Sequence, residues 1–509
     1  MGRAGKASGQ NPTMNGRGKS DGPVVPMKLP NKTGQPVAEV VEGRGPTKGN
    51  PNQRGAFRTQ SRAGAPGALA RVREAARRDK KARFTALLHH VTVDRLRQAF
   101  GEISKDAAPG VDGMTWPQYA EALEDNLQDL HGRLHRGAYR AKPSRRVYIP
   151  KADGQRRALG VSSLEDKVVQ RAVGEVLNTI YERDFLGFSY GFRPGRSQHD
   201  ALDALTVGIL RKKVNWVLDA DIRGFFDTID HAWLMKFVEH RVGDKRVLRL
   251  IQQWLSAGVM ENGSWARSEE GSPQGATISP LLANVYLHYV YDLWALQWRN
   301  RHAGGDMVVV RYADDIVAGF EYRADAERFL HDLKERFRQF ALELHPDKTR
   351  LIEFGRFAAE RRRRAGSGKP ETFTFLGFTH ICGKARSGNF LLLRHTTRPR
   401  MRAKLEKIGS ELKRCRHQPI AIQGQWVGSV VRGYLAYHAI PTNTRATQAF
   451  RREVVKHWHR ALRRRGQRDR TNWRRMTALA RRWIPRALVQ HPWPTERFDG
   501  RTQGGSRVR

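Results

Sequence analysis

Two adjacent aspartates, Asp314 and Asp315, lie between two strand-like segments of the chain. Residues 307–310 read MVVV and residues 316–320 read IVAGF, and such apolar, β-branched runs favour strands. A tight turn between these strands would present both carboxylates at the tip of a hairpin. Because acidic residues are common in turns, this pair alone is weak evidence of chemistry.

A second apolar segment, VNWVLDADI at residues 214–222, carries Asp219 and Asp221 on one face of a predicted strand. If this strand neighbours the hairpin in a sheet, Asp221 converges with Asp314 and Asp315. Three hard oxygen ligands suit Mg²⁺, and two such ions about 4 Å apart stabilise the attacking and leaving oxygens of an in-line displacement. The pattern predicts a nucleotidyl-transfer site that binds two Mg²⁺ ions.

Two cations flank the tip of a predicted hairpin at residues 145–161, which is centred on the dipeptide Asp-Gly. Lys151 and Arg157 could neutralise the charge of a triphosphate there, and the arginine could bind it with two parallel hydrogen bonds. The competing interpretation, two solvated charges on a basic protein, is equally strong on spacing alone.

The loop GSPQGATISP, residues 271–280, combines glycines, prolines and an amide before a long apolar helix. Gly271 and Gly275 allow close backbone approach, and Gln274 offers hydrogen-bond donors and acceptors without charge. This mixture is unusual for a simple loop-to-helix connection, and it favours a ligand-facing role.

The overall composition points to a polyanionic partner. The chain has 509 residues, 39% of them hydrophobic, and a formal net charge of +42. Such a charge exceeds what solubility requires, so nucleic acid is the expected partner, with a ribosomal-type or membrane-surface protein as the alternative. The two cysteines, Cys382 and Cys415, suit a reducing compartment and cannot form a four-cysteine zinc site.

The segments along the chain differ in composition. The first 70 residues hold eleven Lys/Arg, three Asp/Glu and many Gly and Pro, so residues 1–71 are predicted to be a disordered basic tail. The apolar residues Phe84, Leu87, Leu88 and Val91 recur at three- and four-residue spacing, which predicts a helix over residues 71–100. Residues 371–381, ETFTFLGFTHI, are predicted to form one strand, and the chain beyond about residue 395 to be helical and basic. No apolar run of 18 residues occurs, so no membrane span is expected.

In this order, several motifs resemble those of the group II intron-encoded reverse transcriptases, also called intron maturases, over residues 72–498. The motifs are KDAAPGVDGMTW, SYGFRPGRSQHDAL, DIRGFFD, GSPQGATISPLLANVYL, RYADD, LHPDKTRL and FTFLGF. The resemblance implies an α+β right-hand polymerase. Its fingers and palm, with an antiparallel catalytic sheet, would span residues 72–380, and an α-helical thumb and maturase region would span residues 381–509.

The resemblance also implies roles for individual residues. Asp221, Asp314 and Asp315 would bind the two Mg²⁺ ions, and Lys348 would approach the leaving pyrophosphate. Phe226 would pack against the sugar and exclude a 2′-OH, with Phe225 as the alternative. The remaining residues implied by the resemblance are Lys151, Arg157 and Gln274 for the nucleotide, and Asp227 as a helix cap.

The C-terminal region would bind RNA. Residues 451–509 hold eighteen Lys/Arg and four Asp/Glu, and the best predicted contacts are Arg463, Arg464, Arg465, Arg468 and Arg470. The competing interpretation is an ordinary solvated helix face. Of four tryptophans at positions 458, 473, 483 and 493, three or four are expected to lie in the core. The implied partners are group II intron RNA, an RNA template, a DNA primer and target, and dNTPs.

Three alternatives remain at this stage. The chain could be a reverse transcriptase recruited to host defence or to CRISPR adaptation, a non-catalytic RNA-folding factor, or an RNA-dependent RNA polymerase, which Phe226 disfavours. A DNA endonuclease domain is not expected, because two cysteines cannot supply its cysteine pairs. The expected location is the bacterial cytoplasm, in association with the nucleoid.

Overall fold

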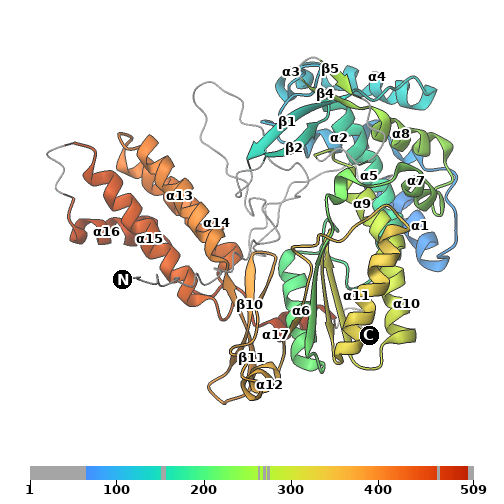
Figure 1. Ribbon diagram of the computed structural model, residues 1–509. Helices are drawn as coiled ribbons and strands as arrows, with labels where there is room; N and C mark the ends of the chain where they lie inside the picture. Colours follow the sequence, from blue (N-terminus) through green and yellow to red (C-terminus); the bar gives the residue numbers. More distant parts are fainter. Residues whose placement is uncertain are drawn as a thin grey trace, which may run out of the picture.

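The structure is a computed structural model that describes residues 65–150, 156–261, 264–266, 271, 275–466 and 471–502. Three β-sheets occur within these residues. Figure 1 shows two sheets within a large body of helices and strands, a third sheet below, and a group of helices that projects to one side. No helix of the described residues is both long and apolar enough to cross a membrane.

The upper lobe of the large body is a set of helices around a mixed sheet of order β2-β1-β4-β5 (Figure 1). Strands β1 and β2 form the predicted hairpin, and β4 adds to β1 in parallel. The elements are β1 (Ser144–Pro150), β2 (Arg156–Val161), β4 (Val259–Glu261), β5 (Ser264–Ala266), α1 (Ala65–Arg78), α2 (Val93–Gly101), α3 (Trp116–Glu121), α4 (Leu123–Arg136), α5 (Leu164–Asp184), α7 (His231–Glu239) and α8 (Lys245–Ser256).

The central sheet is antiparallel with the order β6-β7-β3-β8. In Figure 1 it stands between α6 on one side and α10 and α11 on the other. The elements are β3 (Trp216–Asp221), β6 (Met307–Tyr312), β7 (Asp315–Phe320), β8 (Arg350–Glu353), α6 (Gln198–Arg211), α9 (Ser279–Leu287), a π-helical turn (His288–Asp292), α10 (Leu293–His302) and α11 (Arg323–Arg338).

Alternating residues of the central sheet enter two different hydrophobic cores. Leu218 and Ala220 pack into the core shared with the upper lobe, whereas Val217 and Val317 pack into a core shared with α6 and the third sheet. Because side chains of a strand alternate between faces, Asp221 projects from the same face as Val217. The aspartates therefore lie on the face that is continuous with the third sheet.

The third sheet, of order β11-β10-β9, connects the large body to the projecting helices. Its strands are β9 (Phe373–Phe375), β10 (Phe378–Lys384) and β11 (Phe390–Thr396), and α12 (Ala358–Arg364) precedes them. The helices that follow are α13 (Arg398–Arg414), α14 (Ile420–His438), α15 (Thr444–Arg463), α16 (Trp473–Trp483) and α17 (Pro494–Thr502). We call α13–α16 the helical arm; it has its own core around the fully buried Trp458.

The last helix returns to the large body. Helix α17 packs against α6, and Asp499 accepts a hydrogen bond of 2.7 Å from Nη2 of Arg211. In the same region Asp203 of α6 pairs with Arg394 of β11 at 2.8 Å and with Arg497 of α17 at 3.2 Å. The C-terminal segment thus ties the far end of the chain to the central sheet's helix.

The helix predicted over residues 71–100 is present in part, as α1 up to Arg78 and α2 from Val93, whereas residues 79–92 contain only a 3₁₀ turn at Leu88–His90. Phe84 forms a β-bridge with Val242, and the backbone N–H groups of Leu87 and Leu88 donate to the carboxylate of Asp244 at 2.8 and 2.9 Å. A distant carboxylate therefore replaces the helix carbonyls as acceptor. Helix α1 begins at Ala65, so the tail predicted for residues 1–71 is also wrong over its last seven residues.

The single strand predicted for residues 371–381 is likewise wrong, because the segment folds into the β9–β10 hairpin. Its turn residues, Leu376 and Gly377, both have positive φ angles, of 48° and 81°. Such angles suit a two-residue hairpin turn, but leucine rarely adopts them. The predicted domain boundary between residues 380 and 381 falls inside β10.

Candidate active site

Asp221 and Asp315 lie directly opposite each other at one end of the central sheet. Asp221 is the last residue of β3 and Asp315 the first of β7, and their Cα atoms are cross-strand partners in the antiparallel register. Their exposed fractions are only 6% and 8%. Like charges directly opposite in a sheet are destabilising, so this arrangement calls for a nearby cation.

Asp314 belongs to a two-residue turn that connects β6 to β7. Tyr312 pairs with Asp315, which leaves Ala313 and Asp314 as the turn. Ala313 has a φ of 56°, in the left-handed region that residues other than glycine rarely adopt. Such a backbone persists only when its surroundings hold it, and it is frequent at functional sites. The predicted hairpin tip is therefore present, and the side chain of its residue Asp314 is half-buried.

Lys348 supplies a cation at this end of the sheet. Its Nζ lies 3.3 Å from Oδ2 of Asp221, and its side chain is 34% exposed. The loop before β8 is fixed to the end of β3, because the N–H of His345 donates to the carbonyl of Asp221 at 2.8 Å. Strand β8 pairs with β3, so residues that are more than a hundred positions apart meet here.

The carboxylates of Asp221, Asp314 and Asp315 are suitable ligands for a divalent cation, although they do not yet form a complete coordination site. Among the described residues, no group of three or more His, Cys, Asp or Glu side chains is already arranged to hold a metal ion. Asp221 and Asp315 present two buried carboxylates, and Asp314 is adjacent at the turn. Carboxylate oxygens are the ligands that Mg²⁺ prefers, so the residue types and their placement are compatible with it.

Phe225 and Phe226 follow β3 in a 3₁₀ turn and differ in burial. Phe225 is 2% exposed in the core, whereas Phe226 is only partly buried, with the two rings in edge contact at 5.4 Å. The backbone of this turn is approached by Gly271, where an added Cβ would lie 2.9 Å from the carbonyl oxygen of Phe226. Gly271 therefore lies close to the backbone of the predicted sugar-contacting residue, and the ligand-facing role of its loop stays a prediction.

The predicted helix cap at Asp227 is wrong. Helix α7 begins at His231, and its N-cap is Asp230, whose carboxylate accepts from the N–H of Trp233 at 2.8 Å. The 3₁₀ turn Phe225–Asp227 delays the start of the helix by one turn. The residue types of this segment do not distinguish a 3₁₀ turn from the first turn of the helix.

The predicted triphosphate contacts are described in part. Gly275 approaches β2, because an added Cβ would lie 2.8 Å from the carbonyl oxygen of Gly160. Arg157 is placed in β2 opposite Ile149, but its side chain lies outside the described residues, as do Lys151 and Gln274. The backbone thus brings the Gly275 loop next to the strand that carries Arg157.

The predicted RNA contacts on the helical arm divide into two groups. Arg463 and Arg464 are exposed at the end of α15, whereas Arg465 donates to the carbonyl oxygens of His417 and Gln418 at 3.2 and 3.0 Å. Arg465 therefore holds the arm together. Arg468 and Arg470 lie outside the described residues.

Two of the four tryptophans are not core residues, which contradicts the prediction. Trp458 is fully buried and Trp483 is partly buried, but Trp473 and Trp493 are 53% and 47% exposed. Trp473 begins α16 and contacts the ring of His459 at 4.2 Å. Aromatic faces that reach solvent beside basic side chains suit nucleic-acid stacking.

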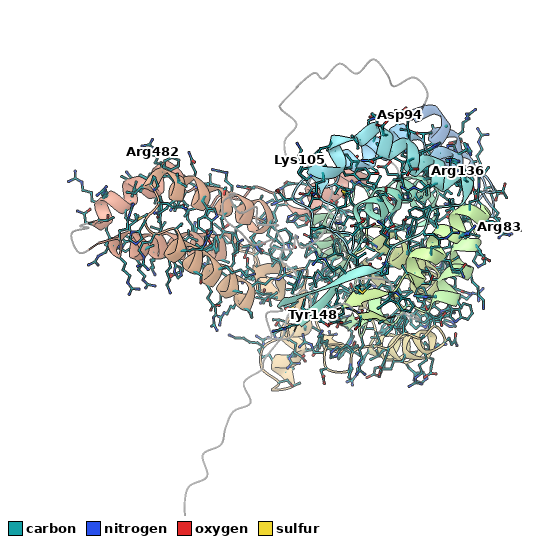
Figure 2. The ribbon with its side chains drawn as sticks, turned by 90° about the horizontal axis from the view of Figure 1, so that it is seen from above. Arg83, Asp94, Lys105, Arg136, Tyr148 and Arg482 are labelled. Carbon is teal, nitrogen blue, oxygen red and sulfur yellow. The ribbon has the colours of Figure 1, made fainter. Side chains whose placement is uncertain are left out.

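The arginines of α16 were not among the predicted RNA contacts. Arg474, Arg475, Arg481 and Arg482 are all exposed, and none of the four forms an ion pair with another described residue. Their spacing of one and seven residues places them on one face of the helix, opposite the buried Met476 and Ala480. Figure 2 shows Arg482 on the arm, well apart from Tyr148 of β1. The helical spacing of these arginines in the sequence could have predicted this basic face.

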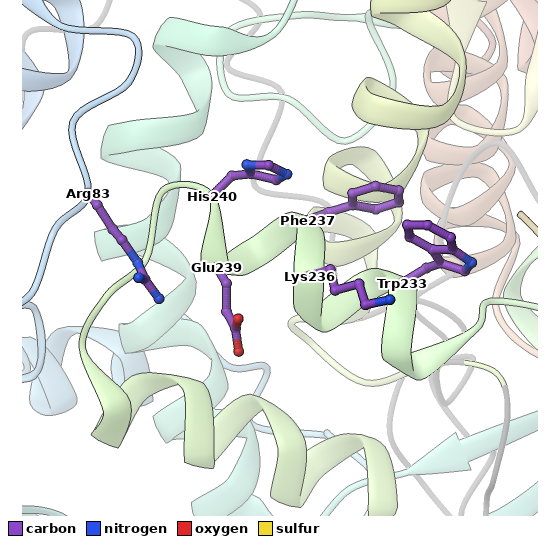
Figure 3. A pocket seen from close by; sticks show the side chains of 6 residues that line it. All are labelled: Arg83, Trp233, Lys236, Phe237, Glu239 and His240. Atoms are coloured by element: carbon purple, nitrogen blue, oxygen red, sulfur yellow. The ribbon is translucent and has the colours of Figure 1, made fainter.

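A shallow hollow of about 380 Å³ on α7 does not coincide with these residues (Figure 3). Its lining residues are Arg83, Trp233, Lys236, Phe237, Glu239 and His240. The ammonium of Lys236 lies 4.5 Å from the Trp233 ring centre, so a cation of the chain already covers that aromatic face. None of the carboxylates predicted to bind metal lines this hollow.

Comparison with known proteins identifies the family of this part of the chain. Residues 149–380 match the family described as reverse transcriptase (RNA-dependent DNA polymerase). Protein YkfC of Escherichia coli (strain K12) is 35% identical over 281 residues, which cover 48% of this chain and 72% of that protein. The matched segment of this chain contains the central sheet and all four of its strands.

Two further relatives are named for introns. The group II intron-encoded protein LtrA of Lactococcus lactis subsp. cremoris is 39% identical over 179 residues, or 35% of this chain and 29% of LtrA. The putative COX1/OXI3 intron 1 protein of Saccharomyces cerevisiae is 26% identical over 420 residues, or 69% of this chain and 49% of that protein. The chain thus spans less than half the length of both intron-named relatives. It belongs to the reverse transcriptase family, among the group II intron-encoded reverse transcriptases.

Proposed function

We propose that this protein copies an RNA template into DNA from a primer 3′-OH and binds the RNA of its group II intron to assist splicing and mobility. The observation that carries the proposal is the cross-strand pair of Asp221 and Asp315, with Asp314 in the adjoining turn, inside a reverse transcriptase domain. The names of LtrA and of the yeast relative favour an intron partner over recruitment to defence.

In this proposal the lobes take the parts of a right-hand polymerase. The central sheet is the palm, the upper lobe is the fingers, and the helical arm is the thumb and maturase region. The two aspartate-bearing strands project their carboxylates on the face shared with the third sheet, so a primer terminus would lie between the palm and the arm.

Asp221, Asp314 and Asp315 would hold two Mg²⁺ ions. When bound, Mg²⁺ neutralises phosphate charge and lowers the pKa of the attacking hydroxyl. The chain's own contribution is to keep the carboxylates in place and to supply Lys348. Because Lys348 now pairs with Asp221 and its side chain is one-third exposed, its flexible stem lets the ammonium leave the carboxylate and contact the leaving pyrophosphate.

Phe226 would select deoxynucleotides. Its ring is the more exposed of the two phenylalanines after β3, and the Gly271 loop approaches its backbone. A bulky ring in that position leaves no room for a 2′-OH. Phe225 is committed to the core, and this leaves Phe226 as the residue for the role.

The helical arm would bind intron RNA through its exposed arginines. Lysine and arginine contacts to phosphates release counterions and supply most of the affinity of nucleic-acid binding. The RNA performs the splicing chemistry, and the protein lends binding energy to one RNA conformation. We place this activity in the bacterial cytoplasm, at the nucleoid, where intron RNA and target DNA meet.

Primer extension tests the proposal. Purified full-length protein is given an annealed DNA primer, a generic RNA template, dNTPs and Mg²⁺ at moderate salt. We expect cDNA from the wild-type protein and none above background from D315N. Synthesis by D315N equal to that of the wild type would refute the assignment of the site. Absence of cDNA from the wild-type protein, with and without the flanking intron RNA, would refute polymerisation and leave only RNA binding.

A further inference from the structure

Arg311 lies in β6, two residues before the turn that carries Asp314, and its side chain is fully buried. All five of its side-chain N–H groups have an acceptor. Nε and Nη2 donate to the two carboxylate oxygens of Asp292 at 2.7 and 2.6 Å, and Nη2 also donates to Oγ of Ser189 at 2.7 Å. Nη1 donates to Oδ1 of Asn284 and to the backbone carbonyl of Ala313, both at 3.0 Å.

The acceptors come from segments far apart in the chain. Asp292 ends the π-helical turn between α9 and α10, Asn284 lies in α9, and Ser189 precedes α6. Asn284 is itself held, because its Nδ2 donates to the carbonyl of Gly191 at 2.7 Å. Single π-helical turns are rare in proteins, and those that occur often lie at functional sites. The guanidinium is therefore the point at which three separate elements meet.

The charge of Arg311 is balanced by one partner. A buried guanidinium is costly unless it is paired and hydrogen-bonded, and Asp292, which is 0% exposed, supplies a two-point pair. His288 also lies near this carboxylate, at 3.9 Å from Nδ1 to Oδ2. Burial lowers the pKa of His288 to about 4, so this ring is neutral at pH 7. Arg311 is thus the cation that faces Asp292.

The turn is held from two sides. Arg311 binds the carbonyl of Ala313, and on the other side an added Cβ at Gly191 would overlap the backbone nitrogen of Ala313. The backbone of Arg311 is fixed as well: its N–H donates to the carbonyl of Phe188 and its carbonyl accepts from the N–H of Tyr190, each at 2.9 Å. The left-handed conformation of Ala313 is therefore imposed by its surroundings and not by its own preference.

We propose that Arg311 is a positioning residue that holds the Ala313 carbonyl and thereby keeps Asp314 and Asp315 in register with Asp221. Its effect on DNA synthesis rests on the proposed function, whereas its effect on the turn does not. The residue acts through the backbone and touches neither substrate nor metal ligand side chains. Lysine cannot replace it, because an ammonium has three donors and no rigid fork to join four acceptor groups.

The test uses R311K in the full-length protein, with R241K as the matched control. Arg241 is 2% exposed, pairs with Asp184 at 2.9 Å, and donates to the carbonyls of Asp79 and Ala82, none of which is an acceptor of Arg311. Amide hydrogen exchange of peptides covering residues 307–320 reports the turn directly. Steady-state primer extension reports kcat and the KM for dNTP.

R311K should lose exchange protection at residues 312–316, and its kcat should fall about 100-fold with little change in KM, as for a small misplacement of catalytic groups. R241K should lose thermal stability but keep both the protection of the turn and kcat. N284A, which removes one acceptor and the tie to Gly191, should loosen the turn to a smaller extent, and it carries the test if R311K does not fold.

Wild-type protection of the turn in R311K would overturn the proposal, as would wild-type protection in N284A if R311K does not fold. An equal loss of that protection in R241K would overturn it as well. A wild-type protein that makes no cDNA, combined with selective loosening of the turn in R311K, would refute the polymerase function and leave the positioning role supported. The two hypotheses therefore fail in distinguishable ways.

Discussion

Arginine serves opposite purposes in the central sheet and in the helical arm. Arg311 is 0% exposed and its guanidinium bonds entirely within the chain. The four arginines of α16 are exposed, and they form no ion pair with other described residues. The first arrangement fixes a backbone, and the second leaves positive charge free for a polyanion. The formal charge of +42 thus includes buried arginines that stabilise the fold and exposed arginines that are available to a polyanion.

This difference has an energetic consequence. A buried, fully hydrogen-bonded arginine acts within a low dielectric and is insensitive to salt, so its loss should change geometry and rate. Exposed arginines act through counterion release, so their loss should change affinity and its salt dependence. Variants in the two regions should therefore separate catalysis from RNA binding.

The largest effect should come from D314A, which removes a predicted metal ligand and leaves the arm intact. We expect cDNA synthesis to fall by about 1,000-fold or more, since metal ions supply several kcal/mol of transition-state stabilisation. Binding of the flanking intron RNA, measured by filter binding, should stay within about twofold of the wild type because the surface charge on the arm is unchanged. Synthesis near the wild-type level would place the chemistry elsewhere.

The β6–β7 hairpin was the part of the candidate site that the sequence predicted best. Two aspartates between β-branched runs, and a third at the end of another apolar segment, identify the strands without any tertiary information. That prediction assumed that β3 pairs with β7, and the sequence did not establish this pairing. Strand order joins residues about a hundred positions apart, and local patterns do not determine it.

The failures have a common cause. The turn at Leu376 and Gly377, the segment that binds Asp244, and the 3₁₀ turn before α7 each depend on a contact or a backbone angle that local residue types do not favour. Arg311 was passed over for the same reason, because its acceptors lie in other segments of the chain. Functional geometry here is set by non-local contacts, which periodicity cannot report.

G191A would disturb the other side of the catalytic turn. An added Cβ at Gly191 overlaps the Ala313 nitrogen, so either the turn or the segment before α6 must shift. We expect kcat to fall about 100-fold, by the same misplacement of the carboxylates, with unchanged RNA affinity. G101A, where a Cβ meets nothing within 4 Å, is the control. Equal kcat in both variants would show that the turn tolerates movement.

F226A should change selectivity more than rate. Removing the ring opens space beside the sugar, and ribonucleotide incorporation relative to deoxynucleotide should rise about 10- to 100-fold, the range for a pocket that discriminates by shape. Competition between labelled rATP and dATP in primer extension measures the ratio. F225A is the comparison: its loss should reduce stability, because Phe225 is a core residue. A rise in F225A alone would transfer the sugar contact to Phe225.

The smallest effect on synthesis should come from replacing all four α16 arginines, at positions 474, 475, 481 and 482, with glutamine. Synthesis on a generic template should stay near the wild-type rate, because the central sheet is untouched. Intron RNA should bind about tenfold more weakly, and the slope of log affinity against log salt should decrease by about 3, as expected for four lost phosphate contacts. R414Q is the control, since Arg414 already pairs with Glu411 at 2.6 Å. A quadruple variant with the wild-type salt slope would show that RNA does not contact this face. The contrast between a buried arginine that fixes the backbone and exposed arginines that bind RNA would then not extend to α16.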